Sequence, residues 1–271
     1  MSMKFKVHGV RGSVSNSSPE FDRYGGNTSC YEIEIDDCQI VIDTGTGFRN
    51  VELDHLKKTI IFYSHWHHDH IQGLAFNSGL FNPKKNTYIT CALNDKNESK
   101  NIIHRYFSGF YFPIELTKKL SNLKFVEFND LKKDFEKDFQ IEFLKLNHPG
   151  GSVGYSIKNQ YKKITILLDN GYDKEQFFDL QKFASKSDYI VFEREKDFVF
   201  ANSNEVREMC EELVDLTDRV FSFKDANYKV WGRSYQGKRD LISRIEMCKI
   251  TDLKSTFTWK KSVDFDNASM I

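Results

Sequence analysis

Four of the chain's eight histidines lie within six consecutive residues, in the run His65-Trp66-His67-His68-Asp69-His70. Imidazoles this close together repel one another when protonated. A divalent cation explains the density, because neutral imidazole is the commonest nitrogen ligand of such ions. The carboxylate of Asp69 among the imidazoles suits zinc or manganese better than calcium, which prefers oxygen ligands alone. The run therefore predicts a metal site.

The spacing within the run indicates two ligand positions. His65 and His67 are two residues apart, so at the end of a strand their side chains can point the same way. Asp69 and His70 follow one turn later and can reach a second position. The alternative is a histidine-rich surface loop or tag. A run that follows a buried strand and contains Trp66 and Asp69 speaks against that alternative.

Short apolar segments closed by Gly or polar residues must position these side chains, and such segments are typical of buried strands. One of them, residues 59–63, leads directly into the histidine run. The other predicted strands are residues 5–10, 31–35, 39–42, 139–146, 163–168 and 219–223. Residues 94–138 predict one or two helices around a loop with Tyr111-Phe112-Pro113, which either covers a site or packs as a separate cluster. Apolar periodicity predicts a further helix over residues 206–214.

Two of the strands end in the same way. Residues 40–42 run into Asp43-Thr44-Gly45, and residues 166–168 run into Asp169-Asn170-Gly171. This echo indicates two similar halves that face each other.

Length and composition favour one domain over residues 1–271, because no linker-like stretch divides the 271 residues. Residues 230–271 form a divergent C-terminal segment to which no element is assigned. The chain has 39 basic and 39 acidic residues, and this balance argues against long nucleic acid as a partner. No apolar run reaches the length of a membrane span. We therefore expect a cytoplasmic protein whose five dispersed cysteines are reduced.

The motif H-x-H-x-D-H after a strand resembles the signature of the metallo-β-lactamase-fold hydrolases. Further motifs resemble the branch that contains cyclic phosphodiesterases associated with carbon–phosphorus lyase and is similar to transfer-RNA 3′-processing endonucleases. These motifs lie in residues 24–30, 43–47, 70–74 and 147–152, and the resemblance covers about residues 5 to 225. It implies an α/β chain folded as a four-layer αββα sandwich, with the site at one edge between the two sheets.

The resemblance also implies the metal ligands of two divalent ions, zinc or manganese. His65, His67 and His148 would bind one ion, Asp69 and His70 would bind the second, and Asp169 would bridge both. Asp69 and Asp169 would be the catalytic residues. Asp43 would hold the histidine loop without touching metal.

One departure from the family concerns the second ion. The family supplies a late histidine, but this chain has no histidine after His148, and Phe223 or Lys224 stands in its place. Ala201 likewise precedes Asn202 and Ser203 where the family often has a histidine. The second site is therefore expected to be weak, empty, or completed by Asp225 or water.

The reaction expected from this resemblance is the hydrolysis of a small phosphodiester by a metal-activated water, the diester being a cyclic nucleotide or a cyclic sugar phosphate. Asn27, Thr28, Ser152 and Arg11 are candidate substrate contacts, because hydroxyl groups, Gly-containing loops and guanidinium groups can approach phosphate oxygens. Two alternatives stay open: an RNA-processing nuclease, and a degenerate, non-catalytic member that binds metal or a nucleotide. The sequence leaves a homodimer open.

Overall fold

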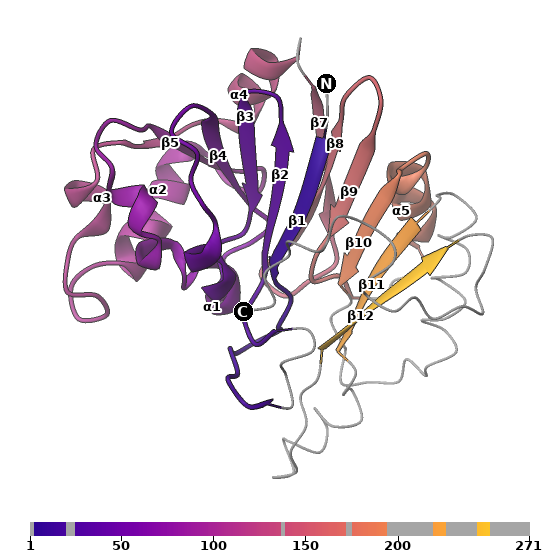
Figure 1. Ribbon diagram of the computed structural model, residues 1–271, viewed down its shortest axis with the longest axis horizontal. Helices are drawn as coiled ribbons and strands as arrows, with labels where there is room; N and C mark the ends of the chain where they lie inside the picture. Colours follow the sequence, from indigo (N-terminus) through magenta and orange to yellow (C-terminus); the bar gives the residue numbers. More distant parts are fainter. Residues whose placement is uncertain are drawn as a thin grey trace. The chain divides into compact units, whose positions relative to one another are not determined.

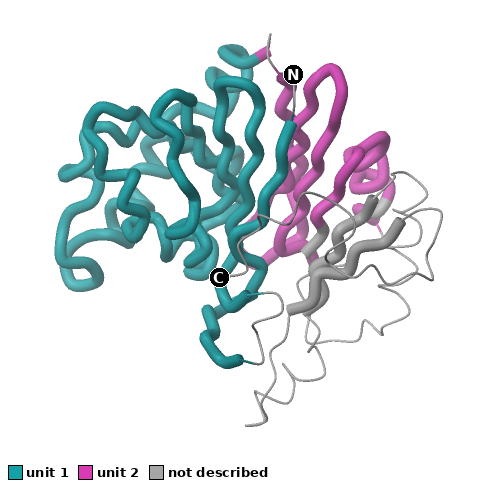
Figure 2. Tube along the Cα trace, in the orientation of Figure 1, with its two compact units in different colours: residues 1–135, 265–271 teal, residues 136–264 magenta. Residues whose placement is uncertain are grey.

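The computed structural model describes residues 3–19, 25–136, 139–171, 175–193, 219–225 and 243–249. These residues belong to two compact units, the first within residues 1–135 and the second within residues 136–264 (Figure 2). The single domain expected over residues 1–271 stays a prediction. No helix in the described ranges combines the length and the apolar character that a membrane crossing requires.

The first unit contains a six-stranded sheet whose strands follow one another in chain order (Figure 1). The first two pairings are antiparallel and the other three are parallel. The strands are β1 (Met3–Gly9), β2 (Cys30–Ile35), β3 (Cys38–Ile42), β4 (Lys58–Tyr63), β5 (Thr87–Cys91) and β6 (Leu123–Phe125). The α-helices are α1 (His68–Ile71), α2 (Lys96–Tyr106), α3 (Leu116–Lys119) and α4 (Phe128–Phe135), and the 3₁₀ turns are η2 (Thr46–Asn50), η3 (Leu74–Phe76) and η4 (Ser78–Phe81).

The central strands of this sheet are apolar because they are buried on both faces. Every residue of β3 is buried, and in β4 only Lys58 is not. Parallel strands covered on both faces read as continuous apolar runs, which is why the sequence pattern located them. The end of β4 is therefore held firmly where the histidine run begins.

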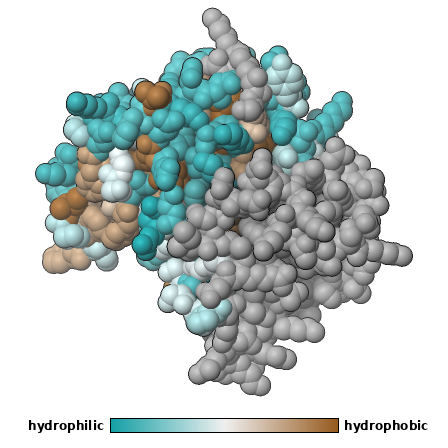
Figure 3. Space-filling model, in the orientation of Figure 1, coloured by the Kyte–Doolittle hydropathy of each residue, from teal (hydrophilic) through white to brown (hydrophobic). Residues whose placement is uncertain are grey.

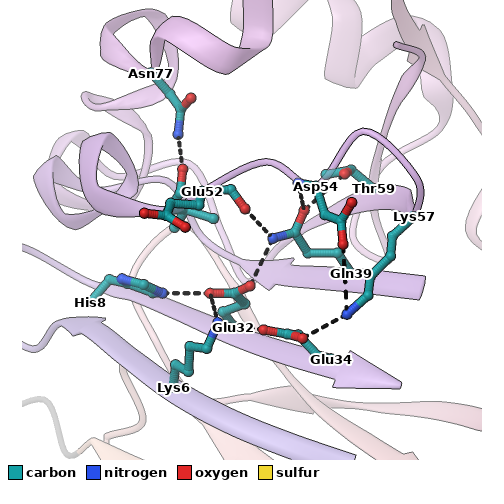
Figure 4. A network of polar contacts seen from close by, with 11 residues as sticks. Lys6, His8, Glu32, Glu34, Gln39, Glu52, Asp54, Lys57, Thr59 and Asn77 are labelled. Atoms are coloured by element: carbon teal, nitrogen blue, oxygen red, sulfur yellow. Dashed lines mark hydrogen bonds and ion pairs between the residues drawn. The ribbon is translucent and has the colours of Figure 1, made fainter. Parts of the chain in front are cut away.

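A network of charged side chains joins β1 and β2 (Figure 4). Glu34 accepts hydrogen bonds from Lys57 at 2.6 Å and from Lys6. Glu32 accepts hydrogen bonds from His8 and Gln39, both at 2.7 Å. Burial alone would raise the pKa of the Glu34 carboxyl, but the two lysines outweigh it and lower that pKa to about 2. The carboxylates on β2 are therefore paired rather than left as lone charges.

The second unit contains another six-stranded sheet, again with its strands in chain order. The strands are β7 (Gln140–Leu146), β8 (Ser152–Lys158), β9 (Lys163–Leu167), β10 (Tyr189–Glu193), β11 (Arg219–Asp225) and β12 (Ser243–Lys249), and α5 (Phe177–Ala184) lies between β9 and β10 in the chain. Two antiparallel pairings are followed by two parallel ones, and β12 is antiparallel to β11. The first five strands thus repeat the directions of β1 to β5, as the echoing strand ends suggested.

For each strand that the sequence predicted, the structure has a strand whose ends differ from the predicted ends by two residues at most. The pattern missed β5, β6, β8 and β10. Three of these, β5, β6 and β10, have five residues or fewer, and β8 follows a glycine pair that was interpreted only as a loop. The structure also places β12 in the C-terminal segment to which the sequence assigned no element. The helix predicted over residues 206–214 lies outside the described residues.

Candidate metal centre

The end of β4 gathers three imidazole rings of the first unit. His65 follows β4 by two residues and is 1% exposed, whereas His67 is exposed. The ring centroid of His65 lies 4.5 Å from that of His67 and 4.1 Å from that of His70. Helix α1 begins at His68 and brings His70, fully buried, back toward His65. The histidine density of the sequence is therefore a real cluster and not a solvated loop.

Asp43 anchors this cluster from the end of β3. Its carboxylate accepts hydrogen bonds from the Ser64 backbone N–H at 2.7 Å and from the Ser64 hydroxyl at 2.6 Å. It also lies 2.7 Å from Nδ1 of His70. Asp43 therefore contacts both ends of the segment that carries the histidines, and its role in holding that segment without touching metal stays a prediction.

These contacts fix which ring nitrogen carries the hydrogen. A carboxylate only accepts, so Nδ1 of His70 donates to Asp43, and in the neutral ring Nε2 then keeps the lone pair. The Ser64 hydroxyl spends its hydrogen on Asp43, so its oxygen accepts from Nδ1 of His65, 3.0 Å away. Nε2 of His65 then also keeps its lone pair. One carboxylate thus prepares two imidazoles as ligands.

Asp69 contacts both a backbone donor and a neighbouring imidazole. One carboxylate oxygen, Oδ2, accepts a hydrogen bond from the Ser13 N–H at 2.7 Å and lies 3.6 Å from Nε2 of His70. Asp69 and His70 therefore lie close together, and the expectation that they share one ion stays a prediction.

Close backbone approaches hold the loop after β3 against α1. A Cβ on Gly45 would lie 2.4 Å from the Asp69 carbonyl oxygen, and one on Gly73 would lie 2.0 Å from the Gly45 carbonyl oxygen. The Thr44 N–H donates to the His70 carbonyl, and the Gly73 N–H donates to the Thr44 carbonyl, both at 2.7 Å. The glycines that surround the histidine run in the sequence therefore serve close packing.

The second unit carries its own pair of ligand-type side chains. Nε2 of His148 lies 3.5 Å from Oδ2 of Asp169. The loops that hold them are tied together, since the Gly171 N–H donates to the Asn147 carbonyl at 2.6 Å and the Asn147 N–H donates to Asn170 at 3.0 Å. Gly150 and Gly151 after His148 both adopt positive φ, which glycine tolerates best.

The candidate substrate contacts are largely engaged within the protein. Thr28 and Thr46 exchange hydrogen bonds between backbone N–H and hydroxyl, both at 2.8 Å. Ser152 opens β8, is fully buried, and donates its hydroxyl to the Leu168 carbonyl at 3.0 Å. Arg11 is 1% exposed and bonds the Gly25 carbonyl at 3.3 Å. The Asn27 carbonyl accepts from two backbone N–H groups.

The remaining predicted positions are those proposed around the missing late histidine, and only some of them are among the described residues. Phe223, Lys224 and Asp225 stand in β11, not in a loop. Residues 201–203 lie outside the described residues.

Sequence reasoning missed Ser64 and Tyr106. Ser64 is a buried hydroxyl directly before the first histidine, and that position was the available clue. Tyr106 ends α2, and its hydroxyl contacts Nδ1 of His68. Burial, and then the charge of Asp69, raise the Tyr106 pKa to about 12, so the hydroxyl keeps its hydrogen at neutral pH.

Comparisons with known proteins bear on this arrangement. The family model described as the metallo-beta-lactamase superfamily matches residues 23–159. A search of curated proteins found no match. Among solved structures, the chain is similar to the metallo-beta-lactamase fold protein YhfI from Bacillus subtilis, with TM-score 0.55, 18% identity, and coverage of 79% of this chain and 83% of that one.

Two further structures cover still more of the chain. Human tRNase Z, short form, has TM-score 0.53, 17% identity, and coverage of 91% and 98%. A diphosphatase from the PhnP family has TM-score 0.56, 13% identity, and coverage of 91% and 97%. At these identities the likeness establishes the fold alone, and it confirms the α/β sandwich class.

The family match covers half of the chain and includes the whole histidine run. Together with the Asp43-anchored imidazoles, it shows that this chain belongs to the metallo-β-lactamase superfamily of metal-dependent hydrolases.

Proposed function

We propose that the chain is a metal-dependent phosphodiesterase that hydrolyses a small phosphodiester, a cyclic nucleotide or a cyclic sugar phosphate. The observation that carries the proposal is the hydrogen-bonded set Asp43, Ser64, His65 and His70. It orients two buried imidazoles so that, in the neutral rings, Nδ1 carries the hydrogen and Nε2 carries the lone pair. Outer hydrogen-bond partners that orient an imidazole in this way are usual around metal-ligating histidines.

The ligand set fits a divalent transition metal. His65, His67, His148 and Asp169 offer three imidazole nitrogens and one carboxylate oxygen, a combination that suits zinc. We assign these four side chains to one ion. We assign Asp69 and His70, with Asp169, to a second ion. The late histidine that the family supplies to this second site is missing here, and the remaining ligands suit manganese. When bound, such ions supply a Lewis acid for a phosphoryl oxygen and an activated water.

The chain's own residues orient the proposed ligands and exclude bulk water from them. Asp43 and Ser64 accept hydrogen bonds from Nδ1 of His70 and His65, so that in the neutral rings Nε2 carries the lone pair that would bind metal. The Ser13 N–H orients the Asp69 carboxylate. Burial of His65 and His70 keeps bulk water from competing for their nitrogens.

Phosphorus is the electrophile that the comparisons favour. One similar structure is a tRNase and another is a diphosphatase. The zero net charge of this chain favours a small diester over long RNA. A non-catalytic, metal-binding member is the second candidate, because no histidine follows His148.

The first test measures metal per chain and hydrolysis of bis(p-nitrophenyl) phosphate with added zinc or manganese. We expect bound metal and turnover. His65→Ala should lower the rate on the order of 100-fold or more, since loss of even an outer-shell partner typically costs about 10–100-fold.

The matched control is His55→Ala, which removes an exposed histidine outside the cluster and should leave the rate unchanged. Bound metal without cleavage of any diester would favour the non-catalytic candidate. Cleavage of a short RNA in preference to small diesters would favour a nuclease.

A further inference from the structure

A cavity of about 990 Å³ lies in the first unit beside the histidine run. Its lining comes from η2, the histidine run, the segment after α1, helix α2 and the loop that follows α2. This volume is at the upper end of the range in which proteins hold small ligands, about 300–1,000 Å³. A ligand larger than a few atoms therefore fits.

Aromatic side chains form much of the lining. The Phe112 ring packs edge-on against Phe107 at 5.2 Å and against Phe76 at 5.9 Å. The Trp66 indole is held by a 2.6 Å hydrogen bond to Asn94. Rings fixed in this way offer flat faces on which a planar ligand can stack.

The aromatic lining extends into solvent. Phe76 is 66% exposed and Tyr111 is 84% exposed, and both line the cavity. Apolar residues also gather on the surface around α3 and the loop before it (Figure 3). Exposed aromatic groups at a cavity mouth mark a binding surface, because leaving them in water is unfavourable.

Two guanidinium groups add positive charge to the aromatic lining. Arg49, in η2, and Arg105, in α2, both line the cavity and are exposed. Within the ranges that the structure describes, no carboxylate pairs with either of them. A guanidinium group offers a planar fork that matches phosphate oxygens. The charge therefore complements an anion that carries an aromatic group.

The cavity is lined by residues that are sequence neighbours of the proposed metal ligands. Trp66 and His68 line it, and in the sequence they alternate with the proposed ligands His65, His67 and Asp69. Tyr106, also in the lining, contacts His68. A molecule in the cavity thus lies against the segment that supplies the ligands.

We propose that this cavity binds the nucleobase and a phosphate group of a nucleotide, so that the substrates are phosphodiesters bearing a base rather than cyclic sugar phosphates. That such a diester is hydrolysed rests on the proposed function, whereas binding of a nucleotide in the cavity does not. Any of the nucleobases can stack on an aromatic side chain, because every base has a π face.

The experiment uses metal-free protein in a chelator, with adenosine 5′-monophosphate and ribose 5-phosphate as probes in calorimetry. We expect the nucleotide to bind about 5- to 150-fold more tightly, which is the range that one stacked base contributes. Tyr111→Ala and Arg105→Gln should each weaken nucleotide binding about tenfold.

The controls are matched to these two variants. Phe110→Ala removes the fully exposed aromatic neighbour that does not line the cavity, and Lys100→Gln removes a charge from the same helix as Arg105. Both should bind the nucleotide like the wild type. Equal binding of the two probes, or an equal loss in Phe110→Ala and Tyr111→Ala, would overturn the inference.

Binding and hydrolysis can fail separately. Nucleotide binding with the predicted variant pattern, but no cleavage of any diester, would support the cavity assignment and reject the proposed function. Cleavage of diesters with no preference for those that carry a base would reject the cavity assignment alone.

Discussion

Asp43 is the residue on which the geometry of the candidate metal centre depends most. It is fully buried, and three donor groups satisfy its carboxylate. An unpaired charge in that position would be strongly unfavourable, whereas charge-assisted hydrogen bonds to fixed donors are among the stronger polar contacts in proteins. The same bonds set the orientation of His65 and His70.

We expect Asp43→Asn to lower metal affinity about 10–100-fold. The amide NH₂ cannot accept a hydrogen bond, so either His70 or Ser64 loses its acceptor. Ser64→Ala should cost less, because only His65 then loses its partner. Competition with a chromogenic chelator measures both affinities. Metal binding of Asp43→Asn equal to that of the wild type would show that Asp43 orients nothing.

At the level of elements, the ends of two strands place the ligands. Asp43 after β3 and Asp169 after β9 both adopt left-handed backbone conformations, with φ of 57° and 47°. Asp is among the few residues other than glycine that enter this region readily. Each carboxylate therefore follows a buried strand, Asp43 directly after β3 and Asp169 one residue beyond the end of β9.

The charged network on β1 and β2 makes this part of the sheet sensitive to pH. The Glu34 pKa is about 2, below its ordinary value of 4.5. Its pairing with Lys57 and Lys6 therefore stabilises the fold fully above pH 4.5, and this stabilisation is lost as the pH falls through 2.

We expect Glu34→Gln to lower the free energy of unfolding by about 0.5–1 kcal/mol at pH 7, because the pairs are partly exposed. The difference from the wild type should shrink as the pH falls from 4.5 toward 2. Urea unfolding at several pH values measures it, with the exposed Glu136→Gln as control. A difference that does not change with pH would mean that the ion pairs contribute nothing.

At the scale of the whole molecule, each unit carries part of the proposed ligand set. The first unit holds His65, His67, Asp69 and His70, and the second holds His148 and Asp169. If these groups share ions as proposed, metal binding depends on both units, and the two ions are not equivalent.

We therefore expect unequal metal occupancy. The site of His65, His67, His148 and Asp169 should fill first, and activity should rise with added manganese as the poorer site fills. Three protein ligands with water still suffice for a catalytic ion. Titration calorimetry with zinc and with manganese measures the two affinities. Two equally tight ions, with no response to extra metal, would refute the inequality, and a histidine from a second chain of a homodimer would explain that result.

The sequence by itself determined the family, the identity of the candidate ligands and the strands in front of them. These features are local: His65 to His70 are covalent neighbours, and the apolar runs of β3, β4 and β9 carry their own pattern of burial. Spacing along one strand and one turn is enough to predict such groups.

Only the tertiary structure decided how these residues are held. The path from Asp43 through Ser64 to His65 joins residues 21 apart in the sequence, and it depends on β3 and β4 lying side by side. Packing also buried Ser152, which the sequence offered as a substrate contact. The cavity brings together Arg49, Trp66 and Phe112 from separate segments, so no periodicity in the chain could reveal it. Hydrogen-bond and packing geometry between distant segments is set by the whole fold, because each contact requires both partners to be positioned within a few tenths of an ångström.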